Sequence, residues 1–139
     1  YYDAVADVYR HQIALFPGAR QVLDRAKAKG IRLAVVTASQ EPLVNAFLSA
    51  HGLTDLFEHV ITATGLPASK PDPAIYRWAV QTMQVTPTDC LAIEDSQQGV
   101  AAALGAGIPT IAFGAHWHDT IPNAAKRAKT FCLSTKILS

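Results

Sequence analysis

Short apolar runs alternate along the chain with longer segments in which apolar residues recur at helical spacing. The runs predict buried strands at 31–36, 59–62 and 90–93, a further strand at 109–113, and an edge strand at 130–133. The segments between them predict helices over 1–15, from Pro17-Gly18 to Gly30, from Ser39 or Gln40 to Gly52, from Asp72-Pro73 onward, and over 97–104 and 122–129. Strands and helices in this alternation predict an α/β fold, with a parallel sheet and helices on both faces.

Composition restricts the choice of partner and compartment. The chain has 139 residues, which suits one domain, and 50% of them are hydrophobic while 17% are charged. A net charge of +1 creates no general field for nucleic acid or an anionic membrane, so we expect a small partner bound at a local site. No apolar run approaches the length of about eighteen residues that is needed to span a bilayer, and no signal peptide is evident. Both observations favour a cytoplasmic location.

Several residues that attract attention are given structural interpretations. Cys90 and Cys132 lack metal-ligand spacing and are predicted to be small buried hydrophobic residues. The run His116-Trp117-His118-Asp119 reads as a surface loop, because alternate histidines with no third ligand make a weak metal site. Trp78 lies at helical spacing with its apolar neighbours and is predicted to face the core.

Polar groups follow three of the predicted buried strands. Glu94 and Asp95 end the strand at 90–93, Thr37 ends the strand at 31–36, and Lys70 lies in the loop after 59–62. Because parallel strands end at one edge of a sheet, these groups are expected to converge. A hydroxyl, a backbone N–H at a helix start and an ammonium suit the oxygens of a phosphoryl group, and a nearby carboxylate suits Mg²⁺.

With these motifs the chain resembles the haloacid dehalogenase superfamily, β-phosphoglucomutase-like branch, over about residues 16–113. The run 33–39 is similar to the family's second motif, which implies that the Thr37 hydroxyl and the Ala38 backbone N–H hold phosphoryl oxygens. The run 69–73 resembles the third motif and implies that Lys70 neutralises the phosphate. The run 92–96 with Gly99 resembles the fourth motif, which makes Asp95 a Mg²⁺ ligand and Glu94 a ligand or a ligand's partner.

The family's first motif, Asp-x-Asp after an apolar strand, is not found in this sequence. In the family its first Asp is the nucleophile and its second is the general acid and base. Asp3 and Asp7 lie four residues apart in a helical pattern, so they are interpreted as solvated helix residues. The chain therefore has no predicted nucleophile. The resemblance also makes 1–15 the last helix of an absent cap domain and 16–139 an incomplete core domain.

In the family the strand of the first motif lies at the centre of the sheet. The resemblance thus predicts a Rossmann-like, doubly wound parallel sheet that lacks its central first strand, and a natural protein longer than this chain. The two flanking strands, 31–36 and 90–93, would otherwise expose unpaired backbone groups. We expect them either to pair directly or to be complemented by a missing segment or a second chain.

The resemblance and the strand-end argument together predict a Mg²⁺-dependent phosphohydrolase acting on a small phosphorylated metabolite. Its nucleophile, which forms an aspartyl phosphate, would lie upstream, so the 139 residues alone are expected to be inactive. Two alternatives stay open. One is a sugar-phosphate mutase of the same family, and the other is a non-catalytic, phosphate-binding regulatory domain. No nucleic-acid or membrane partner is expected.

Overall fold

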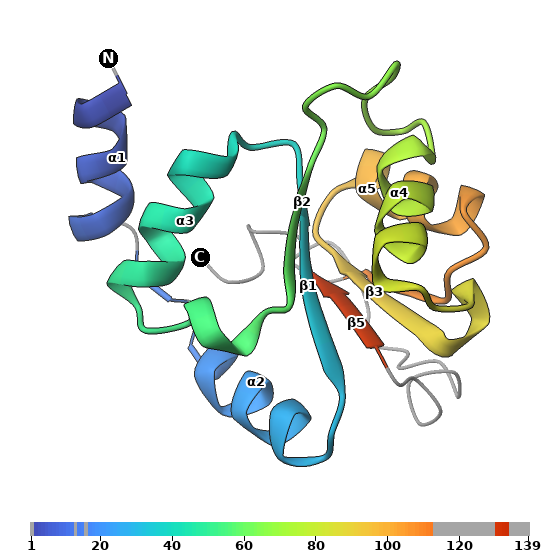
Figure 1. The fold of residues 1–139 in the computed structure, drawn as a ribbon, viewed down its shortest axis with the longest axis horizontal. Coiled ribbons are helices and arrows are strands. Elements are labelled where there is room, and N and C mark those ends of the chain that lie inside the picture. Colours follow the sequence, from blue (N-terminus) through green and yellow to red (C-terminus); the bar gives the residue numbers. More distant parts are fainter. Residues whose placement is uncertain (1, 13, 16, 113–129, 134–139) are drawn as a thin grey trace.

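The computed structural model of the protein describes residues 2–12, 14–15, 17–112 and 130–133. All four pairings between neighbouring strands of its five-stranded sheet are parallel, in the order β2-β1-β5-β3-β4 (Figure 1). The prediction of an α/β fold with a parallel sheet is confirmed. The strands are β1 (Arg32–Thr37), β2 (His59–Thr62), β3 (Cys90–Glu94), β4 (Thr110–Ala112) and β5 (Thr130–Leu133), and the helices are α1 (Tyr2–His11), α2 (Ala19–Ala28), α3 (Glu41–Ala50), α4 (Ala74–Met83) and α5 (Gln97–Gly105).

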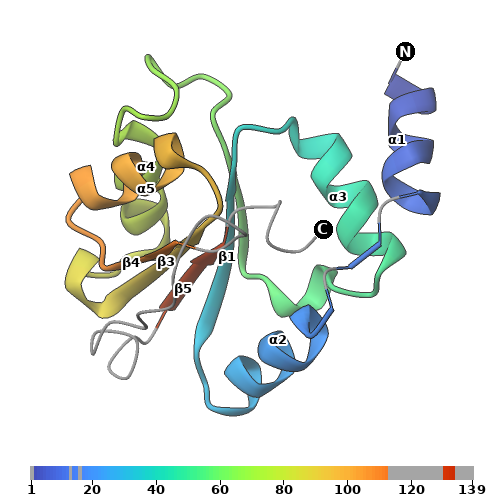
Figure 2. The ribbon, with the colours of Figure 1, turned by 180° about the vertical axis from the view of Figure 1, so that it is seen from behind.

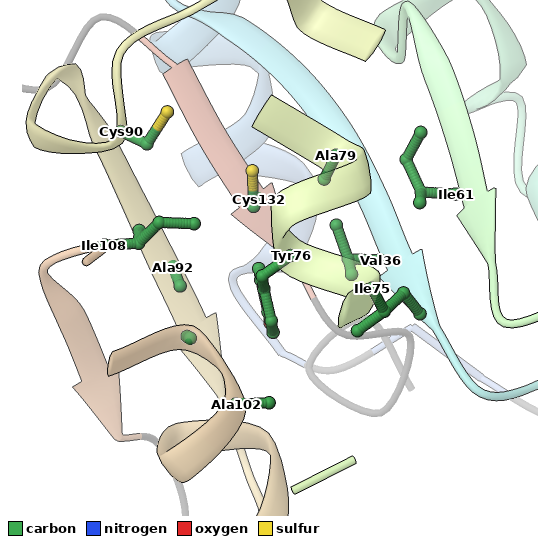
Figure 3. Close-up of a cluster of buried hydrophobic side chains, with 11 residues drawn as sticks. Val36, Ile61, Ile75, Tyr76, Ala79, Cys90, Ala92, Ala102, Ile108 and Cys132 are labelled. Carbon is green, nitrogen blue, oxygen red and sulfur yellow. The ribbon is translucent and has the colours of Figure 1, made fainter. Parts of the chain in front are cut away.

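Helices cover both faces of the sheet. The helices α2 and α3 lie on one face, and α4 and α5 lie on the other (Figures 1 and 2). Successive β1 residues alternate between these faces, because side chains along a strand point to opposite sides. Leu33 and Val35 pack with Leu23 and Phe47 on the first side. Val36 joins the second cluster (Figure 3), which also contains Ile61, Ile75, Tyr76, Ala79, Cys90, Ala92, Ala102, Ala103, Ile108 and Cys132.

The position of β5 corrects one sequence prediction. Residues 130–133 do form a strand, but it lies at the centre of the sheet, paired with both β1 and β3. The strands β1 and β3 therefore each pair with β5 and not with one another. The apolar run predicts a strand, but the local sequence does not determine which strands it pairs with.

The helix α1 packs against α3 and ends at His11, short of the predicted Leu15. The division into a cap remnant over 1–15 and a core over 16–139 stays a prediction. The histidine loop at 114–119 and the helix at 122–129 lie outside the described residues. No helix in the described part of the chain is both long and apolar enough to cross a membrane.

Two predictions about side-chain burial have opposite outcomes. Cys90 and Cys132 are buried, as predicted. Trp78 was predicted to face the core but is 48% exposed. The buried residues of α4 are Ile75, Tyr76, Ala79 and Met83, and they define a narrow stripe. Trp78 lies to one side of this stripe because consecutive helix residues are rotated by about 100°, so the apolar spacing assigned it to the wrong face.

Candidate functional site

Thr37 is the last residue of β1 and lies at the carboxyl edge of the sheet. Its side chain is buried, and its hydroxyl accepts a hydrogen bond of 2.9 Å from the backbone N–H of Ser39. This bond shapes the short turn that leads into α3, a common use of a threonine hydroxyl beside a helix start. The strand end and the turn therefore place Thr37 and the following Ala38 backbone at this edge.

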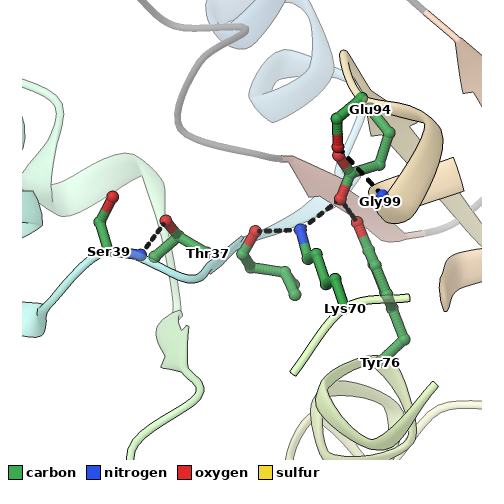
Figure 4. Close-up of polar contacts among 8 residues, drawn as sticks. Thr37, Ser39, Lys70, Tyr76, Glu94 and Gly99 are labelled. Carbon is green, nitrogen blue, oxygen red and sulfur yellow. Dashed lines mark hydrogen bonds and ion pairs between the residues drawn. The ribbon is translucent and has the colours of Figure 1, made fainter. Parts of the chain in front are cut away.

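Glu94 is the last residue of β3 and is completely buried. Its Oε1 atom accepts a hydrogen bond from the Lys70 Nζ at 2.5 Å and another from the Tyr76 hydroxyl (Figure 4). The Lys70 side chain is 11% exposed, and its Nζ also lies 3.4 Å from the carbonyl oxygen of Val36. The Lys70 ammonium and the Tyr76 phenol thus both hydrogen-bond to the Glu94 carboxylate, which would be very costly to bury without such partners.

Lys70 connects the ends of the two strands that flank β5. The described part of β5 ends at Leu133, which is paired with Val35 of β1 and Ile93 of β3. Val36 and Glu94 are the next residues of those two strands, and Lys70 contacts both of them. The ends of β1 and β3 and the loop after β2 therefore converge, as the sequence predicts.

Tyr76 supplies its hydrogen bond from the buried face of α4. Burial raises the pKa of this phenol strongly, and the neighbouring Glu94 carboxylate raises it further. The hydroxyl therefore keeps its proton at neutral pH and acts as a donor. The other carboxylate oxygen of Glu94, Oε2, is buried and has no hydrogen-bond partner among the described residues.

The two adjacent carboxylates fit part of a magnesium site. Asp95 follows Glu94 and is half-buried. The described residues contain no group of three or more His, Cys, Asp or Glu side chains that could hold a metal ion. Mg²⁺ is often bound through only one or two carboxylates, with water and substrate phosphate completing its shell. Because Glu94 already accepts two hydrogen bonds, Asp95 is the better candidate ligand.

The helix α5 begins shortly after these carboxylates in the sequence. The hydroxyl of Ser96 accepts a hydrogen bond of 3.0 Å from the Gly99 backbone N–H and caps the helix. At Gly99 the first turn passes so close to Glu94 that an added Cβ would lie 2.0 Å from Oε2. A glycine at this position is therefore required for Glu94 to point back toward Lys70 and Tyr76.

We expect Gly99→Ala to lower the free energy of unfolding by about 1–3 kcal/mol, the usual cost of overpacking a core. The added methyl would displace a carboxylate that two hydrogen bonds hold in place. Urea denaturation measures this change. Gly105→Ala, on the same helix, is the matched control, because its Cβ would first meet a Pro73 side-chain carbon at 3.3 Å. Equal stability of the two variants would contradict the close approach at Gly99.

Sequence reasoning missed the contacts of Tyr76 and Gly99 with Glu94. Tyr76 lies on the buried stripe of α4, and the helical spacing that places it there is visible in the sequence. What the spacing does not reveal is the direction of its hydroxyl, which depends on how α4 lies across the sheet. The close approach of Gly99 depends in the same way on the position of α5.

The fold and the arrangement of these residues define a Rossmann-like α/β domain with its polar site at the carboxyl ends of parallel strands. The chain belongs to the haloacid dehalogenase-like hydrolase family, whose model matches residues 1–113. The match includes Thr37, Lys70, Glu94 and Asp95 and ends before β5. The central strand of this sheet therefore comes from outside the matched residues.

Several curated proteins and solved structures are similar to this chain. Protein CbbY of Rhodobacter capsulatus is 37% identical over 103 residues, which cover 72% of this chain and 45% of that protein. A phosphoglycolate phosphatase of Vibrio vulnificus is 30% identical over 111 residues, which cover 80% of this chain and 49% of that protein. The crystal structure of CbbY from Rhodobacter sphaeroides in complex with phosphate matches with a TM-score of 0.72 and 31% identity. The match covers 91% of this chain and 57% of that one. The chain thus spans about half the length of the curated relatives it matches.

Proposed function

We propose that this chain is the phosphate-holding part of a Mg²⁺-dependent phosphatase that acts on a small phosphorylated metabolite. The observation that carries the proposal is the contact of Lys70 with the end of β1 and with Glu94 at the end of β3. This places a cation where the carboxyl ends of parallel strands meet, a common ligand position in α/β sheets. Similarity to a phosphoglycolate phosphatase and to a phosphate-bound CbbY supports the choice of ligand.

In this proposal each residue has one role toward the phosphoryl group. The Thr37 hydroxyl and the Ala38 backbone N–H donate to two phosphoryl oxygens. The Lys70 ammonium stabilises the negative charge that develops in the transition state. The attacking carboxylate and the acid-base group come from a segment outside these 139 residues, and the phosphoryl group passes through an aspartyl phosphate to water. We therefore expect no turnover from the 139 residues alone.

Asp95 would hold the magnesium ion, with Glu94 as a second ligand or as the residue that keeps Lys70 in place. When bound, the ion supplies charge neutralisation for the phosphoryl oxygens. The unpartnered Glu94 Oε2 supports a site that is completed by a further cation or donor. The local residues orient and neutralise the ligand, and they do not themselves attack phosphorus.

The test is hydrolysis of an aryl phosphate by a protein that contains these residues together with the segment preceding them in its gene. We expect turnover with Mg²⁺, loss of nearly all activity with excess EDTA, and recovery when Mg²⁺ is restored. The 139-residue chain, assayed in parallel, should show only background hydrolysis. Turnover by the shorter chain, or full activity in EDTA, would refute the proposed roles.

A second function, phosphate binding without turnover, is favoured by the position of β5. This strand fills the sheet between β1 and β3, the place at which the family resemblance predicts the nucleophile's strand. A binding module would retain Thr37, Lys70 and Asp95 and would lack an attacking group. Calorimetric phosphate binding by the longer protein, with no aryl phosphate hydrolysis, would select this function.

A further inference from the structure

The side chain of Tyr76 contacts both members of the buried ion pair. Its hydroxyl donates to Glu94 Oε1, and its ring centroid lies 5.2 Å from the Lys70 Nζ. Tyr76 is 0% exposed, so water does not compete for these contacts. The carboxylate oxygen that binds Lys70 is therefore shared between an ammonium and a neutral phenol (Figure 4).

Because Tyr76 also donates to Oε1, the free-energy cost of moving the Lys70 ammonium from Glu94 to another anion is lower. If Lys70 were the only partner of Glu94, moving its ammonium toward a ligand would leave a buried carboxylate without a donor. Such a loss is expensive, because a buried charge that loses its partner also lacks water. The Tyr76 hydroxyl stays attached to α4 and continues to donate to Oε1 when the ammonium moves.

Among the described residues, the side chains that donate to Glu94 are Lys70 and Tyr76. The second oxygen, Oε2, lies against the Gly99 Cα and has no hydrogen-bond partner among the residues that the structure describes. The nearby hydroxyl of Ser96 accepts from the Gly99 backbone N–H and caps α5. Tyr76 is thus the neutral donor that the described structure provides to Glu94.

We propose that Tyr76 is a positioning residue, which keeps Glu94 hydrogen-bonded so that Lys70 is available to a phosphoryl anion at the end of β1. The inference rests on the proposed function for the identity of the anion. The sharing of Oε1 is a separate matter, and it can be measured without any ligand.

The first measurement is a double-mutant cycle on unfolding by urea, with Tyr76→Phe and Lys70→Met singly and together in this chain. If the two donors share Oε1, each compensates for the loss of the other. Tyr76→Phe should then change the unfolding equilibrium constant roughly tenfold more in the Lys70→Met background than alone. Additive effects would overturn the shared contact.

Thr110→Val is the matched control, since the Thr110 hydroxyl donates a 2.8 Å hydrogen bond to the Ile108 carbonyl away from Lys70. Its effect should add to that of Lys70→Met, as expected for residues that share no partner. A cycle in which Thr110→Val couples as strongly as Tyr76→Phe would show a general loss of cooperativity and would overturn the inference.

The second measurement is the affinity for inorganic phosphate in the presence of Mg²⁺, by isothermal titration calorimetry. It needs only the single variant Tyr76→Phe, so it serves even if Lys70→Met fails to fold. We expect phosphate affinity to fall roughly tenfold, whereas Thr110→Val should leave it unchanged. A Tyr76→Phe protein that is less stable but binds phosphate as tightly as the original would show a purely structural role and overturn the proposal.

The two measurements separate the failure of this inference from the failure of the proposed function. If the unfolding cycle shows strong coupling but the original protein binds no phosphate, the phosphoryl site is refuted. The availability of Lys70 to such an anion is then refuted too, while the shared contact with Oε1 stands. Phosphate binding that Tyr76→Phe leaves intact would refute the inference alone.

Discussion

Asp95→Asn is expected to lower kcat for Mg²⁺-dependent aryl phosphate hydrolysis by at least about 10³-fold in the protein that includes the attacking segment. The asparagine side chain has nearly the shape of aspartate but lacks the negative charge that makes a carboxylate a strong magnesium ligand. Charge stabilisation by a bound metal is worth several kcal/mol in the transition state, and each 1.36 kcal/mol corresponds to a factor of ten in rate.

The control for this substitution is Asp89→Asn, at the opposite end of the same strand. Asp89 precedes β3, whereas Asp95 follows it, so the control makes the same chemical change at the amino-terminal edge of the sheet. Asp89 is half-buried like Asp95 but lies at the other end of β3, so we expect Asp89→Asn to retain activity within about threefold. Activity that survives Asp95→Asn, in a protein folded like the original, would eliminate Asp95 as the metal ligand.

The local pattern of the sequence predicts the elements that border the site. The strand at 90–93 and the carboxylates after it are both found, with β3 extending one residue further to Glu94. The alternation of strands and helices also predicts that Thr37, Lys70 and Glu94 lie at one edge, because that edge is common to all parallel strands. These predictions depend on neighbouring residues and on the handedness of the fold.

The position of β5 could not be predicted in this way. A run such as Thr-Phe-Cys-Leu indicates a strand, but pairing partners far away in the sequence decide its place in the sheet. Cys132 is buried against the α4 and α5 side and Leu133 against the α2 and α3 side, so the strand has an apolar residue for each face. That two-sided pattern is typical of a strand buried on both faces.

The environment of Glu94 was predicted only in general terms. A carboxylate at the end of a buried strand requires a cation or strong donors, and this argument anticipates the contact with Lys70. It does not identify Tyr76, because a tyrosine on an apolar helix stripe is equally well explained by core packing. The distinction depends on the position of a single oxygen atom, which follows from how α4 is oriented on the sheet.

Lys70→Met is expected to lower the free energy of unfolding by about 3 kcal/mol or more, the range found when one member of a buried ion pair is removed. Glu94 would remain completely buried with only the Tyr76 hydroxyl as a partner. Glu94→Gln should cost less, because Lys70 is 11% exposed and also contacts the Val36 carbonyl. The variant that combines Lys70→Met with Glu94→Gln should recover most of the free energy of unfolding lost in Lys70→Met, since replacing a whole buried pair is often close to neutral.

Urea denaturation of all three variants at neutral pH measures these differences. Asp24→Asn provides the control, because it breaks the exposed pair between Arg20 and Asp24, whose side chains are 47% and 53% exposed. Such a pair is worth at most about 0.5 kcal/mol on a helix surface. If Lys70→Met costs no more than Asp24→Asn, Glu94 does not depend on the ammonium. The argument that Lys70 is held between β1 and β3 as a preformed anion site would then be wrong, whatever the protein hydrolyses.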